Sequence, residues 1–241
     1  MIPLKDSIPH RETPFVNYAI MAVNILVFFI QVSLPEPYLI TFIHKYGLVP
    51  ARYTNEVWAF FAGLPPWDYS PFLTNMFLHG GWFHLISNMW ALWIFGDNVE
   101  DRLGHFRYLI FYILCGLAAN MTHFLTDLYS TIPVVGASGA IAGVMGAYLI
   151  LFPYSRIITL IPVFFIPYFI EIPAVLYLVG WFVSQLFPGI LAIVSANNGS
   201  SIAWWAHIGG FIAGIILLPL LRKKEYRRLY PDEIFINYRN L

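Results

Sequence analysis

Apolar stretches follow one another along this chain, and the shorter segments between them hold most of its charged residues. A helix needs about 20 apolar residues to cross a bilayer, and fewer where protein surrounds it. The pattern predicts an all-α integral membrane protein with six transmembrane helices. We expect these helices at residues 15–34, 84–96, 104–125, 138–153, 171–188 and 201–221, with the short second and fourth helices inside the bundle.

The composition agrees with a lipid environment. Of the 241 residues, 59% are hydrophobic and 11% are charged, whereas roughly 25% are charged in soluble proteins. The net charge is zero, and no basic surface with interleaved aromatic residues is evident. We therefore expect the lipid bilayer, and no nucleic acid, as a partner. The single cysteine, Cys115, lies in an apolar stretch and is expected to be a packing residue.

Two connecting segments have patterns of their own. The long first loop, residues 35–81, is rich in aromatic residues and proline, which favours a position in the membrane interface. Between Arg156 and Ile170, Pro162 and Pro167 argue against a continuous helix, and we expect an interfacial connector on the inner side. The predicted organisation is a cytoplasmic N-terminal segment (1–14), a membrane domain (15–221) and a basic cytoplasmic tail (222–241).

The placement of lysine and arginine predicts the orientation, because cytoplasmic segments of membrane proteins carry an excess of these residues. If the N-terminus lies inside, the inner segments hold eleven of them and the outer segments hold only Lys45 and Arg52. Both termini are therefore expected in the cytoplasm, with no cleavable signal at the N-terminus. In this orientation helices two, four and six run inward from the outer face.

These three helices carry polar side chains at or near their outer ends, where a bilayer makes such groups costly unless they have a function. Ser138 begins the fourth helix, His207 follows the start of the sixth, and His84 and Asn88 lie one turn apart on the second. Small residues would let the fourth and sixth helices approach closely and bring the serine hydroxyl to the imidazole. They include Gly139, Ala142, Gly143, Gly146, Gly209, Gly210, Ala213 and Gly214.

A paired serine and histidine are the minimum set for nucleophilic catalysis, in which the histidine takes the hydroxyl proton and returns it to the leaving amine. His84, Asn88 and the backbone N–H of Ser138 can donate hydrogen bonds to the developing oxyanion. No Asp or Glu is placed as a third member of this set. The sequence therefore predicts a catalytic dyad of Ser138 and His207.

Each of these residue types also has a plainer explanation. A serine at a helix start is usually an N-cap, and an intramembrane histidine can be structural, a proton relay or a metal ligand. We expect structural roles for His123 and His79, with water access as the alternative for His79. Glu171 is expected to be an interfacial charge or N-cap at the start of the fifth helix, and Asp68 and Asp127 are expected to be solvated loop charges.

Four motifs, in this order, resemble those of the rhomboid intramembrane serine proteases over about residues 73–218. Any one of them alone would be a weak indication, whereas the ordered set is highly specific. They are His79-Gly-Gly-Trp-Phe-His84-Leu-Ile-Ser-Asn88, Gly96-Asp-Asn-Val-Glu100-Asp-Arg102-Leu-Gly104, Gly136-Ala-Ser138-Gly and Ala206-His207-Ile-Gly-Gly210.

The resemblance implies a six-helix rhomboid-like bundle with a long interfacial first loop. It implies that Ser138 is the nucleophile and His207 the general base and acid, with His84 and Asn88 stabilising the oxyanion together with the Ser138 N–H. Glu100 and Arg102 would brace the inner end of the second helix. Further structural support would come from Gly136, Gly210 and Gly214.

Two positions depart from the family pattern. Many members carry an aromatic residue four positions after the serine, where this chain has Ala142. Met145, Trp204 and Trp205 are then the candidates for holding the His207 ring. The first loop often contains Trp-Arg in the family, whereas Trp67 is followed by Asp68 in this chain.

We therefore expect a serine endopeptidase that cleaves transmembrane protein substrates near the outer ends of their helices. The resemblance implies substrates with small residues at the cut, which reach the site laterally past the fifth helix (Trp181, Phe182). No metal or other cofactor is implied, and no oligomeric state is predicted. The lack of a transit-like N-terminus favours a bacterial or archaeal plasma membrane.

Two other function classes remain open at this stage. An inactive rhomboid-like protein would bind and route membrane proteins without cutting them, but known relatives of that kind lack the serine or the histidine. A small-solute or ion transporter would show paired charges within its spans or inverted repeats. Neither feature is visible in this sequence.

Overall fold

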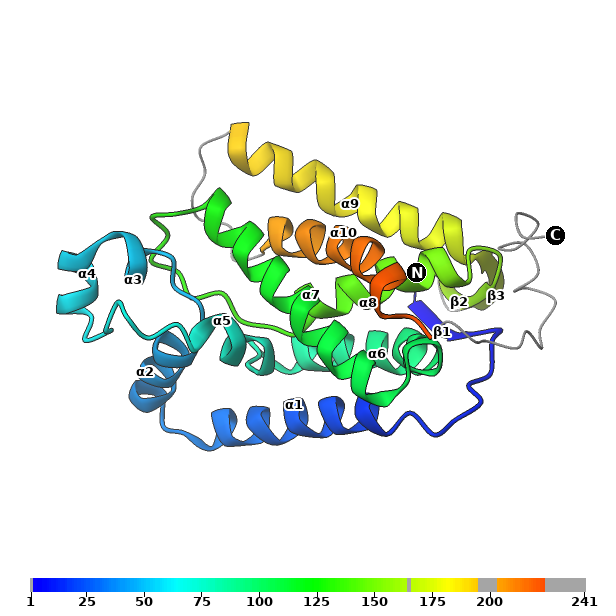
Figure 1. Ribbon diagram of the computed structural model, residues 1–241, viewed down its shortest axis with the longest axis horizontal. Coiled ribbons are helices and arrows are strands. Elements are labelled where there is room, and N and C mark those ends of the chain that lie inside the picture. Colours follow the sequence, from blue (N-terminus) through cyan, green and yellow to red (C-terminus); the bar gives the residue numbers. More distant parts are fainter. Residues whose placement is uncertain (1, 164–165, 195–202, 224–241) are drawn as a thin grey trace.

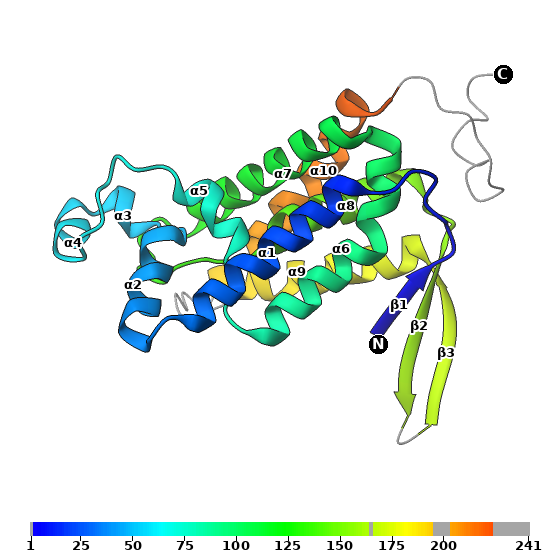
Figure 2. The same ribbon diagram turned by 90° about the horizontal axis from the view of Figure 1, so that it is seen from below.

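A computed structural model describes residues 2–163, 166–194 and 203–223, and helices dominate it (Figure 1). The short helices α2 to α5 lie toward one end of the bundle, and the strands lie at the other (Figures 1 and 2). The long helices are α1 (Phe15–Ser33), α6 (Trp82–Leu103), α7 (His105–Thr126), α8 (Ser138–Leu151), α9 (Ala174–Val194) and α10 (Trp204–Leu221). The short ones are α2 (Glu36–Tyr46), α3 (Ala51–Thr54), α4 (Glu56–Phe61), α5 (Pro71–Thr74) and η1 (Asn75–Phe77).

Among the described residues, four helices are long and apolar enough to cross a membrane, namely α1, α7, α9 and α10. The helix α8 is equally apolar but shorter, and its sequence contains no charged residue. The helix α6 was predicted to be short, which is wrong, because it continues to Leu103 through Asp97, Glu100 and Asp101. These carboxylates can stay in a helix because other parts of the chain donate hydrogen bonds to them.

The helix α8 lies in the middle of the bundle, where α6, α7 and α10 pack around it. Its close approach to α10 depends on glycine, because a Cβ added at Gly214 would overlap the backbone of Gly143. On the other side of α8, a Cβ at Gly143 would lie 2.5 Å from Cys115 of α7. Small residues therefore allow backbone-to-backbone packing in a lipid environment, where dispersion rather than the hydrophobic effect holds helices together.

The all-α prediction is wrong for residues 156–173, which form an antiparallel hairpin of β2 (Arg156–Val163) and β3 (Ile166–Pro173). A third strand, β1 (Ile2–Asp6), pairs with the other edge of β2 (Figure 2). The β-branched run at the start of β2 favours this conformation. Pro162 lies opposite Pro167 of β3, near the tip of the hairpin and beyond Leu160, where the pairing with β1 ends.

This hairpin also changes the fifth helix. Glu171 was predicted to lie at the start of that helix, which is wrong, because it belongs to β3 opposite Ile158. Its carboxylate lies 3.6 Å from Arg156 across the hairpin. The helix α9 begins after Pro173 and continues through Pro188 to Val194.

The segment between α1 and α6 is folded around a buried arginine. The guanidinium of Arg52, fully buried, donates hydrogen bonds to the carbonyls of Pro65 and Lys45 and pairs with the carboxylate of Asp68 at 2.8 Å. Asp68 is therefore an ion-pair partner rather than the solvated loop charge that the sequence suggested. The aromatic side chains of Phe60 and Trp67 remain exposed, and an interfacial position for this segment stays a prediction.

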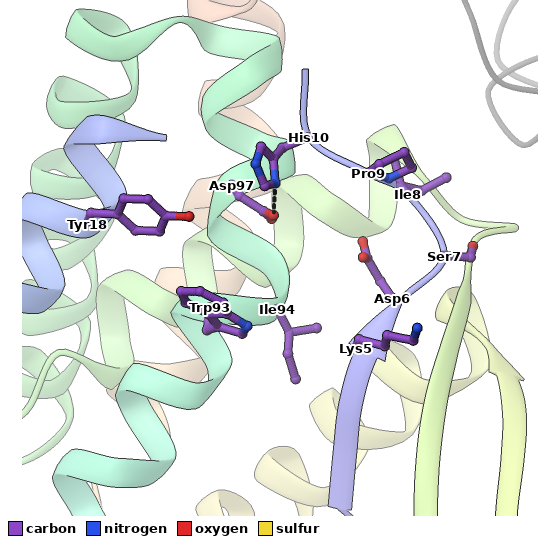
Figure 3. Close-up of a pocket in the computed structure, with 10 residues that line it drawn as sticks. All are labelled: Lys5, Asp6, Ser7, Ile8, Pro9, His10, Tyr18, Trp93, Ile94 and Asp97. Atoms are coloured by element: carbon purple, nitrogen blue, oxygen red, sulfur yellow. Dashed lines mark hydrogen bonds and ion pairs between the residues drawn. The ribbon is translucent and has the colours of Figure 1, made fainter. Parts of the chain in front are cut away.

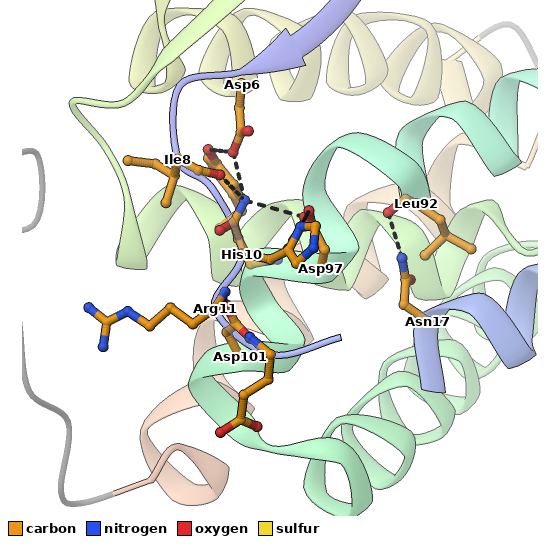
Figure 4. A network of polar contacts seen from close by, with 11 residues as sticks. Asp6, Ile8, His10, Arg11, Asn17, Leu92, Asp97 and Asp101 are labelled. Carbon is orange, nitrogen blue, oxygen red and sulfur yellow. Dashed lines mark hydrogen bonds and ion pairs between the residues drawn. The ribbon is translucent and has the colours of Figure 1, made fainter. Parts of the chain in front are cut away.

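Residues 7–14 cross the end of α6 and satisfy its carboxylates (Figure 4). The Asp101 carboxylate accepts hydrogen bonds from the backbone N–H groups of Arg11 at 2.6 Å and Glu12 at 3.1 Å. Glu100 accepts from the N–H groups of Val16 and Asn17 at the first turn of α1, where a helix leaves its N–H groups unpaired. The N-terminal segment and α6 thus form one polar junction. Residues 224–241 of the predicted basic tail and residues 201–202 of the predicted sixth helix lie outside the described residues.

The strand β1 is tied to the helices through Asp6. Its carboxylate accepts hydrogen bonds from the Tyr148 hydroxyl and, at 2.8 Å, from the Asn98 amide. Burial raises the pKa of Asp6 to about 7, with the Tyr148 hydrogen bond opposing this shift and the Asp97 carboxylate adding to it. Next to these residues lies a pocket of about 350 Å³ that Lys5, His10 and Trp93 help to line (Figure 3).

We predict that Gly214→Ala destabilises the protein by about 1–3 kcal/mol, because the new Cβ overlaps the α8 backbone and forces α8 and α10 apart. The matched control is Gly180→Ala on α9, whose Cβ would meet no atom within 4 Å. This control should leave stability unchanged or raise it slightly. Thermal unfolding in detergent measures both, and equal midpoints for the two variants would contradict the packing argument.

We also predict that the docking of β1 weakens as the pH rises from 5 to 8. The pKa of Asp6 is higher in the folded protein than its ordinary 3.8. The stability it contributes is therefore complete below about pH 4 and is lost as the pH passes about 7. Asp6→Asn stays neutral and should remove this dependence. Amide hydrogen exchange of residues 2–6, corrected for intrinsic exchange rates, measures the effect. The prediction would be refuted if protection changed equally with pH in wild type and in Asp6→Asn.

Candidate active site

The structure brings Ser138 and His207 together. Ser138 is the first residue of α8, and His207 lies in the first turn of α10. The distance from Ser138 Oγ to His207 Nε2 is 2.8 Å, a hydrogen-bond length. The helices can bring these two residues so close because a Cβ at Gly210 would overlap the carbonyl of Gly139, one residue after the serine.

The turn before Ser138 requires a glycine. Gly136 has a φ of +134°, a backbone conformation that residues with a Cβ rarely adopt. A Cβ at this position would also lie 2.8 Å from the His84 ring. The Gly136 N–H donates to the carbonyl of Asn75 in η1, which fixes the turn against the segment before α6. Gly136 therefore places the histidine of α6 beside the start of α8.

His84 and Asn88 lie one turn apart on α6, with donors suited to an anionic oxygen. The Nδ1 atom of His84 accepts a hydrogen bond from the Gly80 N–H at 3.3 Å, so the proton of a neutral ring lies on Nε2. The Nε2 and Cε1 atoms form the edge of the ring that faces Gly136. The Asn88 side chain is buried, and its Nδ2 has no hydrogen-bond partner among the described residues. A buried amide without a partner is costly, which is tolerable where a bound group completes it.

Gln185 was missed in the sequence. It lies on α9, and its Oε1 is 2.7 Å from His207 Nδ1, on the opposite side of the ring from Ser138. Its side chain is buried, with 8% of the residue exposed. The available signal was a glutamine within an otherwise apolar membrane helix, because such polar residues are often functional.

The three candidates for holding the His207 ring have different positions. Trp204 meets the ring edge-on, with centroids 6.4 Å apart, and Trp181 of α9 flanks it at 6.0 Å. Trp205 instead donates its Nε1–H to the Gly189 carbonyl at 3.1 Å. Met145 is buried within α8. Of the predicted three, Trp204 is therefore the one whose ring packs on His207.

Of the residues expected to give structural support, Glu100 and Arg102 lie away from the dyad, at the end of α6. Glu100, in addition to holding α1, accepts from His105 Nδ1 at 2.5 Å. The Arg102 guanidinium lies 4.8 Å from the Phe152 ring centroid, and the Arg102 carbonyl accepts from the Lys223 N–H. Both residues therefore connect the end of α6 to neighbouring segments, whereas Gly136, Gly210 and Gly214 act at the α8 contacts described above.

The other candidate residues are spread over the fold. His79 is buried, and its backbone pairs with the side chain of Gln31 in both directions, at 3.0 and 3.1 Å. His123 lies near the end of α7, and Cys115 is fully buried in the same helix. Within residues 2–163, 166–194 and 203–223, no group of three or more His, Cys, Asp or Glu side chains is arranged to hold a metal ion.

Several known proteins are similar to this chain. RHOMBOID-like protein 5 of Arabidopsis thaliana is 33% identical over 163 residues, covering 67% of this chain and 47% of that protein. Rhomboid protein 1, mitochondrial, of Saccharomyces cerevisiae is 28% identical over 227 residues, covering 88% of this chain and 56% of that protein. YdcA of Bacillus subtilis, which is provisionally named a rhomboid protease, is 28% identical over 158 residues. This match covers 65% of this chain and 69% of that protein.

The chain spans about half the length of the first two of these relatives. The relatives come from a plant, a yeast and a bacterium, and the name of the yeast protein places that protein in mitochondria. The sequence profile of the Rhomboid domain matches residues 66–224, which include α6 to α10 and the Ser138–His207 pair. Since this match covers most of the chain, the protein belongs to the rhomboid family.

Proposed function

We propose that this protein is an intramembrane serine endopeptidase. The observation that carries the proposal is the 2.8 Å contact between Ser138 Oγ and His207 Nε2, formed by two apolar helices. A serine hydroxyl is a weak nucleophile near neutral pH, and a histidine at this distance can activate it by accepting its proton. The four motifs and the family membership support the same chemistry.

The reaction begins when Ser138 Oγ attacks the carbonyl carbon of a peptide bond and His207 Nε2 accepts the hydroxyl proton. The carbonyl oxygen becomes an oxyanion, which the His84 Nε2–H, the Asn88 amide and the Ser138 N–H stabilise. His207 then returns the proton to the leaving amine, and an acyl-enzyme forms on Ser138. Water deprotonated by His207 releases the new carboxyl end and restores the serine.

The proposed topology has six spans, with α6 and α8 added to the four helices that are both long and apolar enough to cross a membrane. The helix α8 is short enough to be surrounded by protein, and Glu100 and Asp101 at the charged end of α6 are buried against other parts of the chain. Lysine and arginine placement supports cytoplasmic termini in a plasma membrane, with the site toward the outer face. The contact of His207 with Ser138 supports a common depth for the starts of α8 and α10.

The proposed substrates are membrane proteins with a helix that unwinds near small residues. Such a helix would approach laterally, past α9 and the segment between α1 and α6. On that side the aromatic rings of Trp181 and Phe182 both pack on Phe211 of α10, with Phe182 at 4.7 Å. Contacts between rings can be exchanged for contacts with a substrate helix, because neither side has a directional bond to lose.

We predict that Ser138→Ala and His207→Ala each lower the cleavage rate by about 10³-fold or more, because each removes one half of the proton transfer. The assay uses the purified protein in liposomes with a single-span substrate that carries small residues at the cut. A serine-directed fluorophosphonate probe should label the wild type and not Ser138→Ala. Cleavage that survives in Ser138→Ala would contradict the proposal. Folded wild type that neither cleaves nor reacts with the probe would favour a non-catalytic binding protein.

We predict that His84→Ala and Asn88→Ala each lower kcat by about 10²-fold, because each removes one donor to the oxyanion. KM should change little, since the ground-state carbonyl is not held by these donors alone. The matched control is Ser87→Ala, the neighbouring residue on α6, whose hydroxyl donates to the His84 carbonyl and is exposed. If the two variants raised KM and left kcat unchanged, His84 and Asn88 would bind substrate rather than stabilise the oxyanion.

A further inference from the structure

We propose that Gln185 is a positioning residue that holds His207 in the tautomer needed to activate Ser138. The inference rests on the proposed protease function and adds a third member to the predicted dyad. The glutamine comes from α9, so the complete unit draws Ser138 from α8, His207 from α10 and Gln185 from α9. It supplies the orienting hydrogen bond that a carboxylate supplies in the familiar serine protease triad, without adding a charge.

The first step concerns which atom of the glutamine amide faces the histidine. The Gln185 Nε2 lies 2.9 Å from the Ser184 hydroxyl oxygen. That hydroxyl already donates its single proton to the Trp181 carbonyl at 2.6 Å, so toward the amide it can only accept. If the amide were turned the other way, Gln185 Oε1 would face the Ser184 oxygen, and neither atom would have a proton to donate to the other. The local contacts therefore place Nε2 toward Ser184 and Oε1 toward His207.

The second step concerns the proton on the ring. The amide oxygen can only accept, so the 2.7 Å contact requires a proton on His207 Nδ1. In the neutral ring Nε2 is then unprotonated, and it faces the Ser138 hydroxyl at 2.8 Å. This is the tautomer that can take the serine proton. The opposite tautomer would donate a hydrogen bond to Ser138 Oγ and could not act as its base.

The third step concerns what else restrains the ring. Trp181 and Trp204 pack against His207 at centroid distances of 6.0 and 6.4 Å. These rings limit its tilt but do not discriminate between its two nitrogens. Gln185 is buried, so water would compete weakly with its hydrogen bond, and the loss of this bond would leave a polar atom of the histidine unpaired. Among the residues that the structure describes around His207, the glutamine is thus the one that selects the tautomer.

The position of Gln185 also links the dyad to α9. This helix lies on the opposite side of the bundle from α1 (Figure 1) and packs mainly on α10. A hydrogen bond weakens steeply when its geometry changes, whereas the apolar contacts of α9 tolerate small shifts. The placement of α9 therefore determines whether His207 is held in the active tautomer.

The test compares Gln185→Leu, which removes the acceptor at similar volume, with Gln185→Glu, which keeps an acceptor. Gln185→Leu should lower both kcat and the rate of fluorophosphonate labelling by about 10–100-fold, the cost of one buried hydrogen bond, with KM unchanged within about twofold. Gln185→Glu should stay within about threefold of wild type. If Gln185 only packed, Gln185→Glu would lose more activity than Gln185→Leu, because a buried carboxylate disturbs packing more than leucine does.

A spectroscopic measurement reads the tautomer directly. In protein with ¹⁵N-labelled histidine, the His207 signals are those missing from His207→Ala. Wild type should show protonated Nδ1 and unprotonated Nε2, and Gln185→Leu should show a mixture of tautomers. The matched control is Val183→Leu, on the exposed face of α9, which should leave the labelling rate and the spectrum unchanged.

The outcomes separate this inference from the proposed function. If Ser138→Ala were labelled like wild type, or wild type were not labelled at all, the protease proposal would fail and this inference with it. If wild type behaved as proposed and Gln185→Leu matched it in labelling and spectrum, only the inference would fail. Should Gln185→Leu not fold, Gln185→Asn replaces it. Asparagine keeps the amide but is one methylene too short to reach Nδ1, so the same loss is expected.

Discussion

The contact between the backbones of α8 and α10 is the constraint on which the rest of the structure depends. It exists because Gly143 and Gly214, and one turn earlier Gly139 and Gly210, leave no side chain between the two helices. In lipid, such close packing supplies the dispersion and backbone contacts that replace a hydrophobic driving force. The 2.8 Å approach of the proposed nucleophile to its base is a direct consequence, since both belong to the first turns of these helices.

The polar groups of the fold are arranged around this apolar contact and are mostly paired. At one end, Glu100 and Asp101 accept hydrogen bonds from backbone N–H groups of residues 11–17. At the other end, the buried Arg52 pairs with Asp68 and with backbone carbonyls. Such pairing lets charged residues continue α6 and lets an arginine be buried, because each desolvated charge has donors or acceptors in place. The Asn88 amide has no hydrogen-bond partner among the described residues, and neither have the ring nitrogens of His79 or His123 Nε2.

Several positions show how tertiary structure overrode local expectations. Residues 156–173 were expected to be an interfacial connector, yet they form a hairpin, and a third strand from the N-terminus pairs with its free edge. That pairing is about 150 residues apart in sequence and leaves no local signal. The sequence predicted a short α6 because the last turns of this helix are charged. The helix can continue because backbone N–H groups of residues 11–17 donate hydrogen bonds to its carboxylates. Glu171 was expected at the start of the fifth helix, but it lies in β3 because residues 166–173 pair with β2.

The sequence by itself determined the apolar helices, the glycine rows, the family and the pairing of a serine with a histidine, because these depend on residue type and local spacing. It also indicated His84 and Asn88 as neighbours, since residues four apart share a helix face. Only the tertiary structure decided that Gln185 meets the far side of His207. The physical reason is that a hydrogen bond between two helices depends on their relative rotation and depth, which packing over the whole bundle sets and no local pattern encodes.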